Sequence, residues 1–223
     1  MIEQLEWDSH FFGCQIGTLT ITDKNEHWPS ANAFKNYDLV YVFSVRPLSI
    51  SAPLMDVKIN YKKHTEPKEI DSRIAQFEPH LHSYSQLLEL AYLSGQHSRF
   101  LKDPFFGPSA FQRLYKKWID SAISDLDTEV LVFVDQNKLE GFVTYTKKTE
   151  NTTIGLLAVS AEAQGMGIGK KLIDAVETKL KKGTLLTVPT QKDNTGACEF
   201  YQKLGFTTQH IHYIYHYEPN SLQ

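Results

Sequence analysis

The sequence predicts an α/β protein of the α+β kind, with a mixed, mostly antiparallel central sheet flanked by helices and a smaller N-terminal α/β region. Three observations lead to this class. Several short segments alternate apolar and polar residues and are rich in β-branched or aromatic side chains, as half-buried strands are. Two longer segments repeat apolar residues at helical spacing. A glycine-rich turn at residues 164–169 joins an apolar run to a third helical pattern.

The N-terminal region carries two strand patterns followed by a polar stretch. Residues 15–22 and 39–45 alternate between apolar and polar side chains, so we expect both to be strands of an N-terminal sheet. The chain then becomes polar between residues 58 and 79. We therefore divide it into an N-terminal α/β subdomain at residues 1–75 and a larger domain at residues 76–223.

The larger domain opens with helical patterns at residues 84–94 and 111–123, and Ser109 is a suitable N-cap for the second. Strand patterns with hairpin-type connections follow. The remaining elements are expected as strands at residues 129–134, 141–145 and 153–159, a helix after the glycine-rich turn, a strand at 185–188, a helix at 197–204, and two terminal strands around Phe206 and at 211–217.

Composition excludes several classes of function. The formal charge of -3 over 223 residues gives no electrostatic footprint for nucleic acid. No apolar run approaches the roughly 18 residues of a membrane span, and the N-terminal residues do not resemble a signal peptide. Cys14 and Cys198 lie far apart, and the histidines show no ligand-pair spacing. We therefore expect a cytoplasmic protein with reduced thiols, no metal, and no nucleic-acid or membrane partner.

The turn at residues 164–169 has the composition of an anion-binding loop. Glycine lets the backbone approach a phosphate, and the N–H groups at the start of the next helix point toward it. A dinucleotide-binding fingerprint would need glycine in place of Lys170. A Walker loop would need glycine in place of Gln164 and Ser or Thr in place of Lys171. The spacing therefore excludes both of these nucleotide-binding turns.

Two motifs resemble those of the GCN5-related N-acetyltransferase (GNAT) family. Residues 164–169, Gln-Gly-Met-Gly-Ile-Gly, are similar to the family loop Gln/Arg-x-x-Gly-x-Gly/Ala, which binds the pyrophosphate of acetyl-CoA. Residues 194–206, Asn-Thr-Gly-Ala-Cys-Glu-Phe-Tyr-Gln-Lys-Leu-Gly-Phe, are similar to the second family signature, Asn-x-x-Ala-x-x-x-Tyr-x-Lys-x-Gly-Phe. The motifs and the elements expected after residue 80 follow the family order. The resemblance therefore implies the GNAT fold.

The resemblance also implies that acetyl-CoA is the co-substrate, without a metal. It assigns the acetyl-CoA contacts to Leu157, Ala158, Val159, Gln164, Gly165, Met166, Gly167, Ile168, Gly169, Lys170 and Asn194. Tyr201, the tyrosine of the second signature, would protonate the departing thiolate, because the ordinary phenol pKa of about 10 is near that of a thiol. A backbone N–H of residues 157–159 would bind the oxyanion, a role that requires no side chain.

Segments outside these motifs resemble the family members that N-acetylate a dTDP-linked amino sugar; they are residues 5–13, 98–100, 111–119 and 154–158. This resemblance implies a small-molecule amine acceptor, with a nucleotide-linked aminodeoxy sugar as the candidate. His97, Arg99 and Phe100, between the first two helices, would contact it, and Arg99 would suit a diphosphate. The alternatives are another amine (a protein N-terminus, polyamine, amino acid or antibiotic) or an acyl-CoA-binding domain without catalysis, which the retained Tyr201 disfavours.

Direct transfer within a ternary complex is the expected mechanism. Cys198 lies inside an expected helix with no adjacent histidine to activate it, so no covalent nucleophile is evident. Residues 152–159 contain no acid or histidine, so we name no general base and expect ordered water to remove the amine proton. A homodimer is left open.

Overall fold

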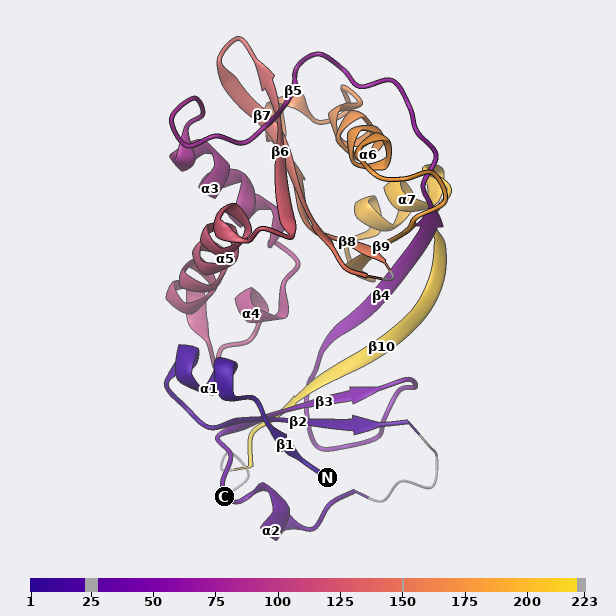
Figure 1. Ribbon diagram of the computed structural model, residues 1–223. Coiled ribbons are helices and arrows are strands. Elements are labelled where there is room, and N and C mark those ends of the chain that lie inside the picture. The colour runs from indigo at the N-terminus through magenta and orange to yellow at the C-terminus, as the bar shows by residue number, and fades with distance from the viewer. Residues whose placement is uncertain (23–27, 150, 220–223) are drawn as a thin grey trace.

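A computed structural model describes residues 1–22, 28–149 and 151–219, and the strands of these ranges form one ten-stranded sheet (Figure 1). The strands are β1 Glu3–Gln4, β2 Ile16–Ile21, β3 Leu39–Ser44, β4 Leu54–His64, β5 Ile74–Gln76, β6 Thr128–Asp135, β7 Lys138–Lys147, β8 Thr152–Val159, β9 Leu185–Gln191 and β10 Thr207–Tyr217. They lie in the order β1-β2-β3-β10-β4-β9-β8-β7-β6-β5. The β2–β3 and β8–β9 pairs are parallel, whereas the other pairs are antiparallel. The predicted α/β class with a mixed, mostly antiparallel sheet is confirmed.

Helices cover both faces of the β6–β8 part of the sheet. The helices of the described residues are α1 Glu6–Phe12, α2 Ala31–Phe34, α3 Tyr84–Ser94, α4 Arg99–Lys102, α5 Gly107–Ser124, α6 Ile168–Lys179 and α7 Thr195–Lys203, with a short 3-10 turn at Ala161–Ala163. Figure 1 shows α3 and α5 on one face and α6 and α7 on the other. Within the described ranges, none of these helices has the length and apolar character needed to cross a membrane.

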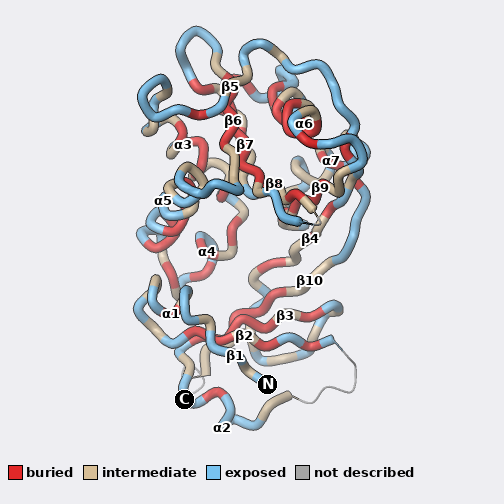
Figure 2. The backbone as a smooth tube through the Cα atoms, in the orientation of Figure 1, coloured by how far each residue is buried: buried red, intermediate tan, exposed pale blue. Residues whose placement is uncertain are grey.

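The core has a layer on each side of β6. Val130 and Val132 pack in one cluster with Leu87 of α3, whereas Leu131 packs in another with Leu172 of α6. Alternate residues of a strand point to opposite faces of its sheet, so β6 is buried on both sides. Figure 2 shows buried backbone along β6 and β7 and on the inner side of α6. These two layers hold the central strands rigidly between the helices.

The predicted elements with strong periodicity are present, but the start of α5 was predicted wrongly. The helix predicted at residues 84–94 coincides with α3, while α5 begins at Gly107 and not after Ser109. Pro108 stands in the first turn of α5, where a fixed φ favours the helix and the missing N–H costs nothing. Ser109 therefore lies inside the helix, and Phe106 occupies the N-cap position.

The prediction of two terminal strands is also wrong. The C-terminal segment is one strand, β10, whose pairing with β4 shifts register between Thr208 and His210 and again between Ile214 and Tyr215. These irregularities interrupt the alternation of side chains, which is why the sequence suggested two shorter strands.

The polar stretch near which the sequence suggested a domain boundary begins inside a central strand. β4 lies between β10 and β9 and pairs with both. Its polar side chains concealed it, because the pattern of residues 58–64 lacks the apolar runs of a buried strand. The predicted domain boundary between residues 75 and 76 falls within β5. The division into two domains stays a prediction.

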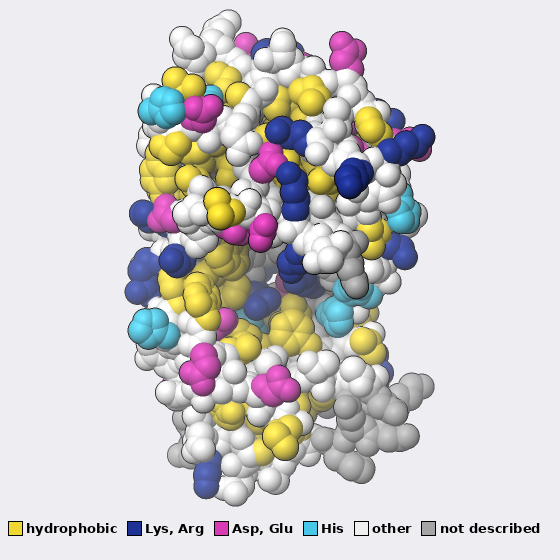
Figure 3. All heavy atoms as spheres, in the orientation of Figure 1, with side chains coloured by type: hydrophobic (Ala, Val, Ile, Leu, Met, Phe, Trp, Pro, Cys, Tyr) yellow, Lys and Arg dark blue, Asp and Glu magenta, His cyan; other side chains and the backbone are white. Residues whose placement is uncertain are grey.

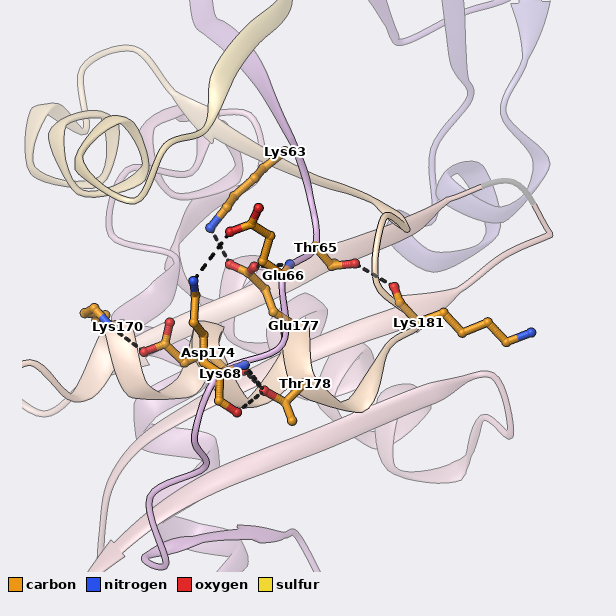
Figure 4. A network of polar contacts seen from close by, with 9 residues as sticks. All are labelled: Lys63, Thr65, Glu66, Lys68, Lys170, Asp174, Glu177, Thr178 and Lys181. Carbon is orange, nitrogen blue, oxygen red and sulfur yellow. Dashed lines mark hydrogen bonds and ion pairs between the residues drawn. The ribbon is translucent and has the colours of Figure 1, made fainter.

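A polar network fastens the segment after β4 to the back of α6 (Figure 4). Glu177 is completely buried, and its carboxylate accepts hydrogen bonds from Lys63 Nζ at 2.6 Å and from the Glu66 backbone N–H at 2.9 Å. Thr178 Oγ1 accepts from the Lys68 N–H and also donates to the Lys68 carbonyl, both at 2.8 Å. A buried carboxylate is stable only when it is paired and hydrogen-bonded, so Glu177 ties the two segments together.

We expect Glu177→Gln to lower the free energy of unfolding by about 2 kcal/mol, because the Lys63 ammonium loses its charged partner in a largely buried place. Glu162→Gln is the matched control, since Glu162 pairs with Lys138 at 3.7 Å while exposed to solvent. That variant should change stability by less than about 0.5 kcal/mol. Urea unfolding at pH 7 measures both values, and equal effects would contradict the role given to Glu177.

Candidate active site

The sheet opens between two neighbouring parallel strands. β8 and β9 pair only at Thr152 with Leu186 and at Thr153 with Thr187. Beyond these residues the strands separate, while β8 stays paired with β7 as far as Val159. Backbone N–H and C=O groups on the free side of β8 therefore have no partners in β9 and are open to a ligand, except the Val159 carbonyl, which accepts from Gln164 Nε2 at 3.3 Å.

A bulge in β8 lies at this opening. Leu157 pairs with Val143 and Ile154 with Tyr145, so β8 has one more residue than β7 between these pairs. The Leu156 N–H donates to Thr144 Oγ1 at 2.9 Å instead of to the β7 backbone. Bulges bend a strand and re-aim its side chains, and they are frequent next to active sites. Here the bulge directs residues that follow it into the opening.

A pocket of about 1220 Å³ occupies the opening and continues toward α4 and β4. Its lining includes Gly155 to Val159 of β8, Pro189 to Gln191 of β9, the start of α6, the pocket side of α7, and Arg99, Trp118 and Asp56 from elements of the opposite wall. Figure 3 shows the molecule hollowed at mid-height, with dark-blue basic side chains inside the hollow. The pocket therefore joins the glycine-rich turn to a charged region in one continuous space.

The glycine-rich turn forms one rim of the pocket. Gly165 and Gly167 have φ values of 80° and 76°, and a side chain at either position would be strained. The first helical hydrogen bond of α6 runs from the Lys171 N–H to the Gly167 carbonyl at 3.1 Å. The N–H groups of residues 168–170 thus precede the helical ladder and remain available to an anion.

Most of the sequence-predicted acetyl-CoA contacts line this pocket. They are Leu157, Ala158, Val159, Gln164, Gly165, Gly167, Ile168, Gly169, Lys170 and Asn194. Met166 does not line the pocket and is 67% exposed. Three side chains are also engaged elsewhere. Lys170 Nζ pairs with Asp174 at 2.5 Å, Asn194 Oδ1 caps α7 by accepting from the Ala197 N–H at 3.1 Å, and Gln164 Nε2 donates to the Val159 carbonyl at 3.3 Å. Ligand contacts from Lys170 and Asn194 would therefore use their remaining groups.

Tyr201 lies on the pocket side of α7 and is 5% exposed. Its ring packs against Phe200 and Phe206, with ring centroids at 5.1 and 5.6 Å. Burial raises the pKa of the Tyr201 phenol well above its usual value. Tyr201 therefore holds its proton throughout the neutral range, which is the state that a proton donor needs.

The three predicted acceptor contacts also line the pocket. His97 lies 3.7 Å from Asp193, measured between Nδ1 and Oδ1. The Arg99 guanidinium lies over the rings of Phe100 and Tyr41, with its central carbon 4.5 and 4.9 Å from their centroids. Phe100 is buried and contributes mainly to the wall behind Arg99. The structure thus brings His97, Arg99 and Phe100 into the same space as Tyr201.

Four further residues of the pocket were missed by sequence reasoning. Asp56 and Lys58 come from β4, and Tyr115 and Trp118 from α5. Burial raises the pKa of Asp56 to about 6, although the nearby Arg99 opposes this shift. No sequence signal marks Asp56 or Lys58, because they belong to the strand that the polar pattern concealed. Asp56 is therefore a carboxylate that changes charge close to neutral pH.

The chain belongs to the acetyltransferase (GNAT) family, whose sequence pattern matches residues 94–206. The splayed strands and the glycine turn agree with this assignment. Members of the family are acetyltransferases that use acetyl-CoA.

Curated relatives share part or all of the sequence. The spore coat polysaccharide biosynthesis protein SpsD of Bacillus subtilis is 26% identical over 137 residues, which are 60% of this chain and 47% of that protein. The 5-NmdU N-acetyltransferase of Pseudomonas phage PaMx11 is 34% identical over 74 residues, 32% of this chain and 52% of that protein. The matches thus span about half the length of these two relatives. The dTDP-fucosamine acetyltransferase of Escherichia coli O6:H1 is 25% identical over 95% of this chain and 96% of that protein.

Solved structures share the fold. A conserved Staphylococcus epidermidis protein of unknown function superposes with a TM-score of 0.62 and 15% identity, covering 92% of this chain and 84% of that one. A GCN5-related N-acetyltransferase from Sphaerobacter thermophilus gives a TM-score of 0.52 and 16% identity, covering 81% and 60%. At these identities the likeness concerns the fold alone, and the predicted GNAT fold is confirmed.

We expect acetyl-CoA to raise the melting temperature of the wild-type protein, and Gly167→Glu to abolish this shift. The new carboxylate would stand where the N–H groups of α6 attract an anion. Gly183→Glu is the matched control, because Gly183 also has a positive φ of 84° with nothing within 4 Å of an added Cβ. A thermal shift titration measures both. An unchanged ligand response of Gly167→Glu would contradict the placement of acetyl-CoA at this turn.

Proposed function

We propose that the protein transfers the acetyl group of acetyl-CoA to the amino group of a nucleotide-linked aminodeoxy sugar, directly and within a ternary complex. One observation carries this proposal: a single pocket joins the glycine-rich turn and Tyr201 to Asp56, Lys58 and Arg99. Both substrates would then meet without a carrier. The names of the relatives add support, since two of them act in sugar chemistry.

The residues around the opening fit acetyl-CoA, which supplies the acetyl group as an activated thioester. The turn at residues 164–170 offers N–H groups and the positive end of the α6 dipole to the pyrophosphate. After Thr153, the side of β8 that faces away from β7 offers backbone hydrogen-bonding groups to the pantetheine. The pantetheine would bind there as a neighbouring strand would. A backbone N–H among residues 157–159 would stabilise negative charge on the thioester oxygen.

Two side chains would handle the protons. Asp56 accepts the proton of the acceptor amine, since its carboxylate is ionised above a pKa of about 6. Tyr201 donates a proton to the departing CoA thiolate. Its phenol is protonated at neutral pH, and burial raises its pKa further above that of a thiol, so it donates only as negative charge forms on the sulfur. The acetyl group moves from sulfur to nitrogen as one C–S bond breaks and one C–N bond forms.

Cys198 takes no part in this scheme. Its thiol donates to the Gln191 carbonyl oxygen at 3.5 Å and approaches the Lys192 carbonyl at 4.0 Å. A thiol without activation stays protonated and is a weak nucleophile. Direct attack of the amine on the thioester is therefore the simpler path.

A panel of amines tests the acceptor class. With acetyl-CoA saturating and thiol release as the readout, a dTDP-4-amino-4,6-dideoxyhexose should react with a higher kcat/KM than free amino sugars, polyamines or peptides. Initial-rate lines against both substrates should intersect. A peptide or polyamine preferred over every nucleotide sugar would overturn the acceptor, while parallel lines with a trapped acetyl-cysteine would overturn the mechanism.

We expect Tyr201→Phe to lower kcat by roughly 10²-fold or more, the usual loss when a positioned acid is removed, with little change in acetyl-CoA affinity. Tyr61→Phe is the control, because Tyr61 is a buried phenol with its ring 6.1 Å from that of Tyr201 but does not line the pocket. Full activity of Tyr201→Phe would show that the Tyr201 hydroxyl does not donate the proton and that the ring only packs.

With acetyl-CoA saturating, we expect kcat/KM for the acceptor to rise with pH through about 6, because kcat/KM follows the pKa of the protein without bound acceptor and Asp56 accepts a proton only when it is ionised. Asp56→Asn should remove this limb and lower the plateau by roughly 10²-fold. Asp135→Asn, which removes an exposed carboxylate 3.9 Å from Arg73, should keep both the limb and the rate. If the rise in rate with pH near 6 persists in Asp56→Asn, another group must be responsible for it.

A further inference from the structure

Two basic side chains share the acceptor end of the pocket without forming a direct ion pair among the described residues. Lys58 of β4 and Arg99 of α4 both line it. Neither takes part in the ion pairs formed among the residues that the structure describes, and Arg99 Nε is buried without a hydrogen-bond partner. Cations in so enclosed a place are normally paired, because desolvation of a single charge is costly.

The nearby carboxylates form no direct ion pair with these two cations among the described residues. Asp193 is held by Lys102 and faces His97. Asp56 and Asp8 act on Arg99 only at longer range, and burial raises the pKa of both. Burial and the Arg99 charge together lower the pKa of Lys58. The N–H groups of these two cations therefore have no carboxylate of the described residues within ion-pair distance and are available to an incoming anion.

The position of Arg99 is fixed by stacking and not by an ion pair. Its guanidinium lies against the rings of Tyr41 and Phe100, so its edge stays free to donate. A planar guanidinium with free N–H groups binds phosphate oxygens in a bidentate manner. Lys58 adds a point charge from the same face of β4 as Asp56, because the two residues are two positions apart in one strand.

An aromatic surface lies beside the cations. Trp118 lines the pocket, with ring centroids 4.8 Å from Tyr115 and 6.0 Å from Phe100. A half-buried indole of this kind offers an apolar face to a flat ligand ring. The neighbouring cations and the aromatic face together match a phosphate ester attached to a planar base.

We infer that Lys58 and Arg99 bind the diphosphate of the acceptor, and that the enzyme recognises its acceptor as a nucleoside diphosphate conjugate while Asp56 faces the amine. This inference rests on the proposed acetyl transfer to a nucleotide-linked amine. It adds that the phosphates, which do not react, hold the acceptor in place. Binding energy from such remote groups aligns the amine for attack.

Calorimetric titration of dTDP tests the site without turnover. Acetyl-CoA is kept saturating, so that dTDP cannot enter the glycine-rich turn. We expect dTDP to bind the wild type, thymidine to bind at least tenfold more weakly, and Arg99→Gln and Lys58→Gln each to raise the Kd of dTDP at least tenfold. Lys62→Gln is the matched control, because Lys62 lies on the same strand, is exposed, and does not line the pocket. The Kd of dTDP for Lys62→Gln should stay within about twofold of the wild-type value, because an exposed charge outside the pocket contributes little to binding.

Equal binding of dTDP and thymidine, or an unchanged Kd in both pocket variants, would overturn the phosphate site. If Arg99→Gln fails to fold, Lys58→Gln is the variant that decides. We expect it to fold, because the Lys58 backbone is held in β4 by pairing with both neighbouring strands. A separate outcome identifies failure of the proposed function: dTDP binding that depends on Lys58 and Arg99, with no nucleotide sugar acetylated, would keep the site and reject the reaction. Acetylation of an unphosphorylated amine that dTDP does not inhibit would instead keep the transferase and reject the site.

Discussion

The separation of β8 from β9 is the constraint on which the site depends. A sheet loses stability where neighbouring strands part, so each side of the gap needs support of its own. β8 is held by β7 and by α3, whereas β9 is held by β4, which is paired in turn with β10. The long strand β4 therefore keeps the gap open, and the same strand carries Asp56 and Lys58 into the pocket.

Buried charged side chains occur in two different settings in this structure. Glu177 is enclosed behind α6 with both carboxylate oxygens satisfied, which favours stability. At the pocket, Arg99 lies against aromatic rings, and neither Arg99 nor Lys58 forms a direct ion pair among the described residues, although Asp56 lies nearby. Departures from full pairing are expected at functional sites, where the missing partner belongs to the ligand. The contrast separates the part of the molecule that stabilises the fold from the part that is arranged for binding.

Much of the fold could be predicted because its signals are local. The periodicity of residues 84–94 predicts α3, and the turn before α6 is marked by its own glycines. The failures also have local causes. Pro108 moves the start of α5 ahead of Ser109, bulges make β10 look like two strands, and β4 is polar because its side chains face the pocket and Glu177.

The sequence by itself determined the family and the end of the site that would hold acetyl-CoA, because each of the two motifs is contiguous and its geometry follows from backbone conformation and a helix start. Only the tertiary structure showed which residues line the other end of the pocket, where the sequence had marked only His97, Arg99 and Phe100. Asp56, Arg99 and Trp118 lie on β4, α4 and α5, and no spacing along the chain relates them. Their shared pocket, and therefore their charges and pKa values, arise from burial and from neighbours that meet only when the sheet and its helices have packed.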